Sequence, residues 1–333
     1  MQNDVNIYHI AQLAGVSKST VSRVLNGHAD VSKNTRMRVR QAIEESSYIP
    51  NNSARSLPSF STKTVVLLVC GITNPFFSKI ISIILEKMSR SYDVILHSFE
   101  PGVDVNIIDA AISICKEKRP KGMILLGGNF EESHEMLRNL HIPIVMASTT
   151  IHGCEDRSWF SSISLDDEKE GYKMADYVCK GGHRKIAVIG QYGLREAGIY
   201  AAFKEYGVEA AEGELEFDRA YSFLTGYKAA KKLLESDTYT CFLCLSDVFA
   251  IGVMKAVLEK GLRIPADVSV VGFDGIENSF YTNPLLTTFV QPFEEIAEKS
   301  VSQLLALINK GEPNRHITVL TEINTGGSFT KKT

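Results

Sequence analysis

The feature that most constrains this chain is a regular alternation, from residue 64 onward, of short apolar runs with longer amphipathic segments. Residues 65–69, V-V-L-L-V, form an unbroken apolar run that ends before Gly71, which is typical of a parallel strand buried on both faces. The pattern predicts strands at residues 65–69, 94–99, 123–126 and 144–146, and helices at residues 76–88, 106–118 and 133–140. Strands that alternate with helices in this way predict one doubly wound α/β half.

A second stretch of the chain repeats this plan. It predicts strands at residues 162–165, 186–189, 241–245 and 268–271, and helices at residues 168–178, 195–206, 225–234 and 249–260. A long helix at residues 292–308 and a strand at residues 317–320 follow. Two successive halves predict a bilobed body, and ligands of such folds bind in the crevice at the carboxyl ends of the strands.

Residues 7–26 predict a different module, two short helices joined by a tight turn at Gly15. Apolar side chains recur at helical spacing in both helices: Ile7, Ile10, Ala11 and Ala14 in the first, and Val21, Val24 and Leu25 in the second. Ser17 is a good N-cap for the second helix. Its opposite face carries Lys18, Ser19, Ser22 and Arg23. This layout predicts a helix-turn-helix whose second helix enters a DNA major groove, and the alternative is a helical pair within an ordinary α domain.

The next segment predicts the rest of an N-terminal head and a connection to the body. Ser32 is placed to cap a third helix, which we expect to end before Pro50 because proline disfavours a helical residue before it. Residues 51–57, N-N-S-A-R-S-L, could form two helical turns, too short to be stable alone in water. The sequence therefore predicts a DNA-binding head at residues 1–50 and a hinge helix with its linker at residues 51–62.

Charge is distributed unevenly between these parts. Residues 1–60 carry seven Lys and Arg side chains against four Asp and Glu, a net charge of +3. The whole chain carries −3, so the remaining residues carry −6. A basic head on an acidic body indicates an anionic partner for the head alone.

Several other classes of protein are disfavoured by the sequence. No apolar run reaches the roughly 18 residues of a membrane span, and the start lacks a secretory signal, so we expect a cytoplasmic protein without a membrane partner. Cys241 and Cys244 lie in an apolar run, where we expect reduced, buried thiols instead of a metal or redox pair. The chain lacks G-x-G-x-x-G, G-x-x-x-x-G-K-[ST] and G-x-S-x-G, so we expect no cofactor, no metal and no enzyme activity.

The chain resembles the lac repressor/galactose repressor family of bacterial transcription regulators along nearly its whole length. Three matching segments lie in the head and hinge: A-G-V-S-K-S-T-V-S-R-V-L-N-G at 14–27, Y-I-P-N at 48–51 and A-R-S-L at 54–57. The body adds N-P-F-F at 74–77, G-H-R-K-I-A-V-I-G at 182–190, I-P-A-D-V-S-V-V-G-F-D at 264–274 and P-L-L-T-T at 284–288. The resemblance implies a periplasmic-binding-protein-like body with an N-lobe at residues 63–160 and about 290–320, and a C-lobe at residues 161–289 and about 321–333.

The resemblance also implies which residues contact DNA. Lys18, Ser19 and Arg23 occupy the family's base-reading positions, and Ser22 lies on the same face. Positions that contact phosphates, or lie close to them, are Tyr8, Ser17, Thr20, Asn26, Ser32 and Thr35. Asn51, Ala54 and Leu57 belong to the hinge, and Leu57 matches the leucine that enters the minor groove. For each single Ser or Thr, the alternative is a helix cap or an ordinary surface position.

Residues that follow the strand ends, together with the family's cleft positions, form the predicted effector site. These residues are Asn74, Phe76, Phe77, Asp166, Arg195, Tyr221, Asp247, Asp274, Gln291 and Phe293. Helix-end packing is the alternative for Phe76 and Phe77, and a structural ion pair is the alternative for Arg195 and Asp274. The chain departs from the sugar-binding pattern at Gly71 and Ser148, where many members carry a polar residue, often aspartate.

We therefore expect a homodimeric, ligand-responsive transcription regulator, most simply a repressor, that binds a near-palindromic double-stranded operator. The expected effector is a sugar or glycoside, with a purine-like or other metabolite as the alternative. A transport-type solute-binding protein would share the body, but the basic head disfavours it. An α/β enzyme is the third possibility, and no motif in the chain supports it.

Overall fold

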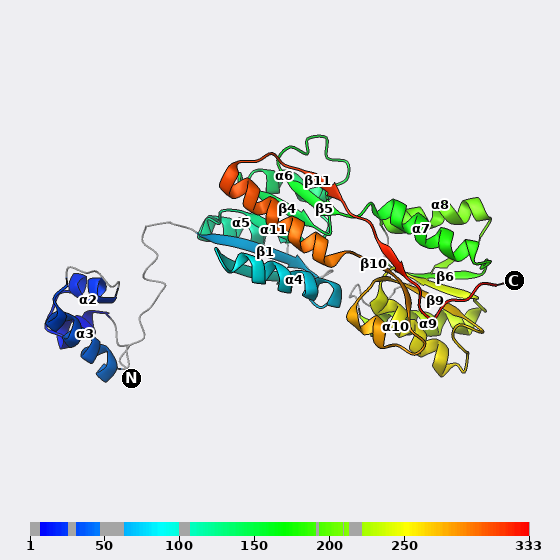
Figure 1. Cartoon of the computed structure of the whole chain (residues 1–333), viewed down its shortest axis with the longest axis horizontal. Helices are drawn as coiled ribbons and strands as arrows, with labels where there is room; N and C mark the ends of the chain where they lie inside the picture. Colours follow the sequence, from blue (N-terminus) through cyan, green and yellow to red (C-terminus); the bar gives the residue numbers. More distant parts are fainter. Residues whose placement is uncertain are drawn as a thin grey trace. The chain divides into compact units, whose positions relative to one another are not determined.

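The computed structural model describes residues 7–25, 31–46, 63–99, 107–190, 193–208, 210–212 and 222–332 (Figure 1). The chain forms two compact units, Met1–Ser61 and Thr62–Thr333. Some predicted residues lie outside the described ranges: Asn26, Asn51, Ala54 and Leu57 of the DNA-binding set, and Tyr221 of the effector set. The predicted hinge at residues 51–62 also lies outside them.

The first unit contains the three predicted helices, α1 (Ile7–Leu13), α2 (Lys18–Leu25) and α3 (Lys33–Ser46). Their apolar side chains form one small core, in which Ile10, Val21 and Val39 are fully buried. Ser17 Oγ accepts a hydrogen bond from the Thr20 backbone N–H at 3.2 Å, and Ser32 Oγ accepts one from the Thr35 N–H at the same distance. Both predicted N-caps are therefore confirmed.

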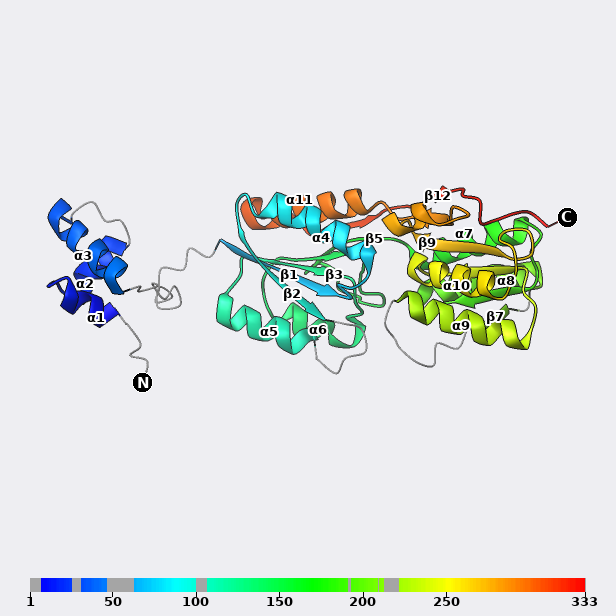
Figure 2. The ribbon, with the colours of Figure 1, turned by 90° about the horizontal axis from the view of Figure 1, so that it is seen from below.

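The second unit contains two six-stranded sheets. The first sheet has the order β11-β5-β4-β3-β1-β2, with all its pairs parallel. Its strands are β1 (Thr64–Cys70), β2 (Asp93–Phe99), β3 (Met123–Leu126), β4 (Ile144–Ala147), β5 (Ser161–Ser164) and β11 (His316–Thr318). Its helices are α4 (Pro75–Met88), α5 (Ile107–Lys118), α6 (His134–Arg138) and α11 (Phe293–Lys310), and a 3₁₀ turn, η2 (Glu131–Ser133), precedes α6. Figure 2 shows α4 and α11 on one face of this sheet and α5 and α6 on the other.

Alternating residues of β1 supply the two cores of this lobe. Leu67 packs in the cluster that contains Ile80 of α4 and Leu304 of α11, whereas Leu68 packs in the cluster that contains Ile108 of α5. Because successive strand residues point to opposite faces, an unbroken apolar run is required when helices cover both faces. The prediction of a doubly wound sheet with buried parallel strands is confirmed here.

The second sheet has the order β12-β10-β9-β8-β6-β7, and its β10–β12 pair is antiparallel. Its strands are β6 (Ile186–Ile189), β7 (Ala210–Glu212), β8 (Cys241–Cys244), β9 (Ser269–Asp274), β10 (Thr287–Val290) and β12 (Glu322–Asn324). Its helices are α7 (Asp167–Lys180), α8 (Leu194–Tyr206), α9 (Phe223–Ser236) and α10 (Asp247–Glu259), and a 3₁₀ segment, η3 (Glu277–Tyr281), follows β9. In Figure 1, α7 and α8 cover one face of this sheet, and α9 and α10 cover the other.

One strand belongs to a different lobe from the one predicted. We expected residues 162–165 to open the second half, but β5 pairs with β4 on one side and with β11 on the other, within the first sheet. The C-lobe therefore begins after β5, at α7. The buried Ser161 and Ser162 hydroxyls bond to Asn314 and His316 in the segment that leads into and forms β11, which fixes β5 in that sheet.

The chain passes between the two sheets three times: from β5 to α7, from β10 to α11, and from β11 to β12. At the third crossing, buried Glu170 of α7 accepts hydrogen bonds from the backbone N–H and the hydroxyl of Thr321. Lys173 of the same helix donates to the Thr321 carbonyl at 2.7 Å. These bonds tie the third crossing to the C-lobe.

Reciprocal glycines bring the C-lobe helices into backbone contact. A methyl group added at Gly171 of α7 would lie 1.8 Å from the backbone oxygen of Arg195, and one added at Gly198 of α8 would lie 1.8 Å from that of Glu168. In the α9–α10 pair, Gly226 and Gly252 likewise allow close contact between the helix backbones. The absence of a side chain at these positions sets how closely the helices pack.

Candidate nucleic-acid interface and ligand site

The predicted DNA-reading face of α2 is exposed. Ser17, Lys18, Ser19 and Arg23 are exposed, and Tyr8 of α1 is 64% exposed. The Lys18 ammonium donates a hydrogen bond to the Tyr8 hydroxyl at 3.2 Å and lies 4.6 Å from the ring centroid. The two helices therefore present these side chains as one surface, with hydroxyl and cationic groups side by side.

Hydroxyl groups gather at the N-termini of α2 and α3. The Ser17 Oγ lies 2.7 Å from the Ser19 Oγ and 2.8 Å from the Thr20 Oγ1, while the Ser32 and Thr35 hydroxyls lie 2.9 Å apart. Helix N-termini attract anions because their first N–H groups have no partner within the helix. The capping role of Ser17 and Ser32 is observed, and contact of this set with phosphates stays a prediction.

Arg38 has a role that its place in the sequence does not reveal. From the sequence alone, Arg38 contributes only one basic charge to the head. Its guanidinium reaches from α3 to the end of α1 and donates to the backbone oxygens of Ala14 and Gly15. Gly15 has φ = +60°, which glycine adopts without strain. Arg38 therefore holds the turn between α1 and α2 in place. An arginine five positions into the third helix gives no sequence signal for this contact.

The predicted ligand-binding arginine lies at the start of α8. Arg195 donates from Nη2 to Asp167 Oδ1 at 2.6 Å and from Nη1 to the Leu245 backbone oxygen at 3.1 Å. Its guanidinium also lies 3.7 Å from the ring centroid of Phe273. An ion pair does form, as the alternative proposed, but its partner is Asp167, not Asp274.

Asp274 lies at the end of β9 with a positive φ of 111°, and its side chain is buried. Ser246 donates to its Oδ2 and Gln291 Nε2 donates to its Oδ1, both at 2.7 Å. Burial raises the pKa of Asp274 to about 6, although the charge of Arg195 and these two hydrogen bonds lower it. Within the described part of the chain, the buried Gln291 Oε1 receives no hydrogen bond. Asp274 and Gln291 therefore offer acceptor oxygens beside the donors of Arg195.

Asp247 lies at the start of α10, and its carboxyl bonds to the turn that follows Asp274. It is fully buried and accepts hydrogen bonds from the N–H groups of Gly275 and Ile276, at 2.8 and 3.0 Å, and from the Thr288 hydroxyl at 2.6 Å. Burial, and next the charge of Asp274, raise the pKa of Asp247 to about 8. Asp247 therefore holds the turn after Asp274, and its contact with a ligand stays a prediction.

The predicted residues of the first lobe lie at the start of α4. Asn74 is buried and caps the helix by accepting a hydrogen bond from the Phe76 N–H at 3.0 Å. Phe76 is buried in the core, and its ring centroid lies 5.3 Å from that of Phe77. Helix-end packing, the alternative for this motif, is therefore observed for Phe76. In the second lobe, Asp166 caps α7 and pairs with Lys169 at 2.6 Å.

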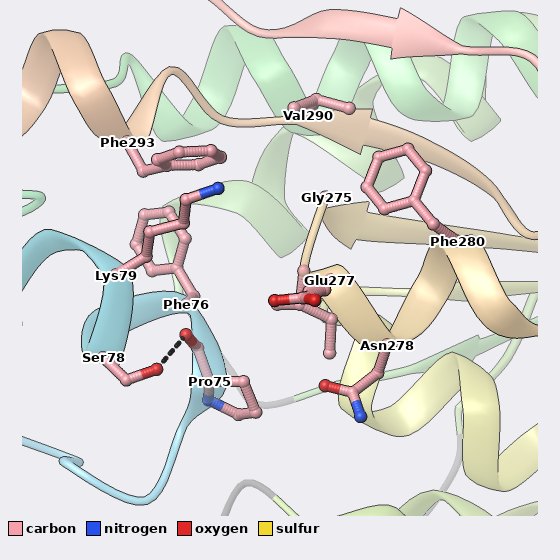
Figure 3. Close-up of a pocket in the computed structure, with 11 residues that line it drawn as sticks. Pro75, Phe76, Ser78, Lys79, Gly275, Glu277, Asn278, Phe280, Val290 and Phe293 are labelled. Carbon is pink, nitrogen blue, oxygen red and sulfur yellow. Dashed lines mark hydrogen bonds between the residues drawn. The ribbon is translucent and has the colours of Figure 1, made fainter.

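Two hollows are lined by residues that are neighbours of Arg195 and Asp274 in the sequence. The loop-side hollow, about 390 Å³, is lined by residues that include Ser148, His152, Leu165, Asp167 and Leu194. The helix-side hollow, about 660 Å³, lies between α4 and the segment after β9 (Figure 3). Its wall contains Phe76 and Phe293 of the predicted set, but also Lys79, Glu277, Asn278 and Phe280, which the sequence analysis did not select.

Neither a membrane span nor a metal site is found in the described residues. No helix in these ranges combines the length and the apolar character that crossing a membrane requires. The same ranges contain no group of three or more His, Cys, Asp or Glu side chains arranged to hold a metal ion.

Two known families match parts of the chain. Residues 6–51 match the bacterial regulatory proteins of the lacI family, and residues 175–329 match the periplasmic binding protein-like domain. The HTH-type transcriptional regulator MalR of Clostridium butyricum is 38% identical over 331 residues, which cover 96% of this chain and 97% of that protein. The HTH-type transcriptional repressor PurR of Erwinia tasmaniensis is 33% identical and covers 94% of this chain and 93% of its own length.

Solved structures share the fold. The lac repressor bound to ONPG in the repressed state is 25% identical, with a TM-score of 0.70 over 98% of this chain and 100% of that one. A complex of the transcriptional regulator CelR with cellobiose is 24% identical, with a TM-score of 0.69 and the same coverage of both chains.

Proposed function

The chain belongs to the lacI family of bacterial regulatory proteins, and on that premise we propose that it is a homodimeric transcription repressor controlled by a small effector. The DNA-binding part of the proposal rests on the exposed face of α2, which presents Lys18, Ser19 and Arg23. The helix contains no acidic residue. A helix of this kind fits the major groove, where an arginine can bind a guanine edge with two hydrogen bonds.

Replacement of Arg23 tests this assignment. We expect Arg23→Ala to weaken specific operator binding roughly 5- to 150-fold, because one bidentate base contact contributes about 1–3 kcal/mol of discrimination. A gel-shift titration at one fixed salt concentration measures the loss, since phosphate contacts make all affinities salt-dependent. Arg40→Ala removes the same charge from α3 and serves as the matched control. Equal operator affinity of Arg23→Ala and the parent protein would contradict the role of Arg23.

Two unusual acceptors support a small-molecule effector between the lobes. Asp274 is a buried carboxyl at a strand end, and the buried Gln291 Oε1 has no donor within the described residues. A buried acceptor without a partner costs about 1–3 kcal/mol, which a ligand hydroxyl or N–H would recover. Arg195, whose charge lowers the pKa of Asp274, adds hydrogen-bond donors. This mixture of donors and acceptors suits a polyhydroxylated ligand, so a sugar or glycoside is our first choice, ahead of a purine-like or other metabolite.

A thermal-shift screen of sugars and nucleobases tests the class of effector. A ligand present at 100 times its Kd stabilises the folded body by about 2.7 kcal/mol, which raises the melting temperature by several degrees. Asp274→Asn should reduce the shift that the active ligand produces. If nucleobases stabilise the protein and sugars do not, the alternative effector class is correct.

Homodimer formation is part of the proposal because an operator with two half-sites requires two heads. The edge strand β2 supports it, since Leu96 on this strand is 40% exposed and an uncovered apolar edge favours pairing. Sedimentation of the full chain measures the oligomeric state, and a monomer that still binds a palindromic operator at high affinity would contradict this part.

A further inference from the structure

Two buried carboxyls meet where β8 and β9 end. Asp247, the first residue of α10, is fully buried, and Asp274, the last residue of β9, is 4% exposed. Ser246, which precedes Asp247, donates its hydroxyl to Asp274 Oδ2 at 2.7 Å. In return, Gly275, which follows Asp274, donates its N–H to Asp247 Oδ2 at 2.8 Å. Their chain neighbours therefore hold the two carboxyls near each other, although burial disfavours a charge on either of them.

Few cations face this pair. Within the described part of the chain, no Lys, Arg or His side chain forms an ion pair or a hydrogen bond with either carboxyl. The charge of Arg195 lowers the pKa of Asp274, but its guanidinium pairs with a third carboxyl, Asp167, whose charge raises that pKa. The Cys244 thiol of β8 also lies near Asp247, and burial keeps it neutral by raising its pKa. Among these groups, three carboxyls share one guanidinium, so a charge on Asp247 would lack a counter-ion of its own.

The hydrogen bonds of Asp247 leave one of its oxygens able to hold a proton. Oδ2 accepts the N–H groups of Gly275 and Ile276, at 2.8 and 3.0 Å. Oδ1 lies 2.6 Å from the hydroxyl oxygen of Thr288, and a hydroxyl can accept a hydrogen bond as well as donate one. A side chain at Gly272 would clash with Oδ1, so this oxygen packs directly against the backbone of β9. A protonated carboxyl would donate from Oδ1 to Thr288 and keep both bonds at Oδ2.

We propose that Asp247 is a proton-binding site of the body: its carboxyl is protonated in the folded protein at neutral pH, donates a hydrogen bond to Thr288, and ionises only in alkaline solution. Ionisation places a second negative charge beside Asp274 and disfavours the turn that Asp247 holds. Gly275 and Ile276 of that turn line the helix-side hollow together with residues of α4 in the other lobe. The protonation state of Asp247 therefore acts on a wall that the two lobes share.

A proton held only by the folded chain makes stability depend on pH. Burial, and next the charge of Asp274, raise the pKa of Asp247 from 3.8 to about 8. The contribution of Asp247 to stability therefore falls as the pH rises from about 4 to about 8, and it is constant above that range. Between pH 6 and 8 the pH already exceeds the pKa of Asp274, so Asp247 is the main contributor of the pair. One such proton raises the unfolding constant by up to about ten-fold per pH unit.

Infrared spectroscopy of the full chain at pH 7 tests the proposal directly. A protonated carboxyl has a C=O stretching band that a carboxylate lacks. We expect this band in the parent protein, and we expect Asp247→Asn to remove the part that one carboxyl contributes. Asp237→Asn is the matched control and should leave the band unchanged. Asp237 is exposed, and hydrogen bonds from Thr238 and Lys185 lower its pKa, so its carboxyl is ionised at this pH.

Urea unfolding between pH 6 and 8 gives a second test. The amide of Asp247→Asn can copy the bonds of a protonated carboxyl, because its NH₂ group can donate to Thr288 while its oxygen accepts the two N–H groups. We therefore expect the variant to fold and to lose this part of the pH dependence. The unfolding constant of the parent, divided by that of the variant, should rise by up to about ten-fold per pH unit. The ratio cancels the titration of histidines, which both proteins share.

Two results would overturn the proposal: the same pH dependence of unfolding in the parent and in Asp247→Asn, or an infrared band that is lost in Asp274→Asn and retained in Asp247→Asn. If Asp247→Asn does not fold, carbon-13 NMR of the aspartate carboxyls in the parent decides the question. An aspartate that titrates above pH 7 supports the proposal, and the absence of one overturns it. None of these measurements requires an effector, so their failure would leave the proposed function intact.

Discussion

Gly171→Ala is an informative single change in the body, because it acts on helix packing and on the predicted ligand-binding Arg195 together. The new methyl group would lie 1.8 Å from the backbone oxygen of Arg195, whereas a carbon–oxygen contact normally measures about 3.3–3.6 Å. The two backbones must therefore separate by roughly 1.5 Å. No side-chain rotation can relieve the clash, since both groups belong to or adjoin the main chain.

The expected change in the free energy of unfolding is the sum of two opposing contributions. Overpacking of a tight interior costs about 1–3 kcal/mol, and a backbone clash of this size places the change at the upper end. Alanine in a helix interior gains roughly 1 kcal/mol over glycine. The net destabilisation is therefore about 2 kcal/mol, which corresponds to a fall in melting temperature of about 4 °C or more. The same movement would stretch the 2.6 Å bond between Arg195 and Asp167 beyond hydrogen-bonding range.

Thermal unfolding of the full chain, with and without the sugar found by screening, measures both effects. We expect Gly171→Ala to lower the melting temperature and to lose most of the ligand-induced shift. Gly193→Ala is the stability control, because Gly193 has an extended φ of 169° and no heavy atom within 4 Å of an added methyl group. A melting temperature of Gly171→Ala within 1 °C of the parent would refute the packing described for α7 and α8.

Three further predictions concern the site, the head and the crossings. Because the pKa of Asp274 is about 6, effector affinity should fall as the pH drops through that value and the acceptor is protonated, and calorimetry across about pH 5 to 8 should show no such fall for Asp274→Asn. Arg38→Met should destabilise the head by about 1–2 kcal/mol through lost hydrogen bonds to the α1 terminus, measured by circular dichroism, with Arg40→Met as the control. Thr321→Val should cost about 1–3 kcal/mol in urea unfolding because it deprives buried Glu170 of a donor, and Thr321→Ser should restore most of this loss.

Long apolar runs made most of the fold predictable. Residues 123–126 and 186–189 were expected as strands, and β3 and β6 have these same limits, because each strand is buried on both faces and so contains apolar residues only. The three head helices were predictable for a similar reason, since few side chains had to form a core and serine caps marked two of their starts.

Strands without an apolar run were missed or misplaced. Thr287 and Thr288 of β10 are fully buried, and their hydroxyls bond to the Gly326 N–H and to Asp247, so a polar sequence occupies a core position. The edge strand β12 is three residues long and largely exposed, and β7 is equally short, so neither has a recognisable period. The pairing of β5 depended on contacts with β11, about 150 residues later, which local patterns do not reveal.

The contacts of the predicted site residues were less predictable than the strands, and their contact with a ligand stays a prediction. Asp247 and Asp274 were both selected because each follows a strand end. Only the structure shows that Asp247 accepts hydrogen bonds from the turn after Asp274, whereas Asp274 accepts one from Gln291. The salt-bridge partner of Arg195 came from the start of a neighbouring helix, 28 residues earlier. Lys79 and Glu277 were overlooked because exposed charges are common. The two side chains come from different lobes, and only the folded body places both of them at one hollow.

The crossing between β11 and β12 also constrains how the protein is made. Both strands complete a sheet: β11 pairs beside β5 in the first lobe, and β12 pairs beside β10 in the second. They lie only three residues apart and are synthesised after every other described strand. Chains fold from the N-terminus during synthesis, so the head can close its small core early while both lobes still have an unpaired edge. The nascent body is therefore exposed to aggregation until its last segment emerges, and one truncation before residue 316 would remove an edge strand from both lobes at once.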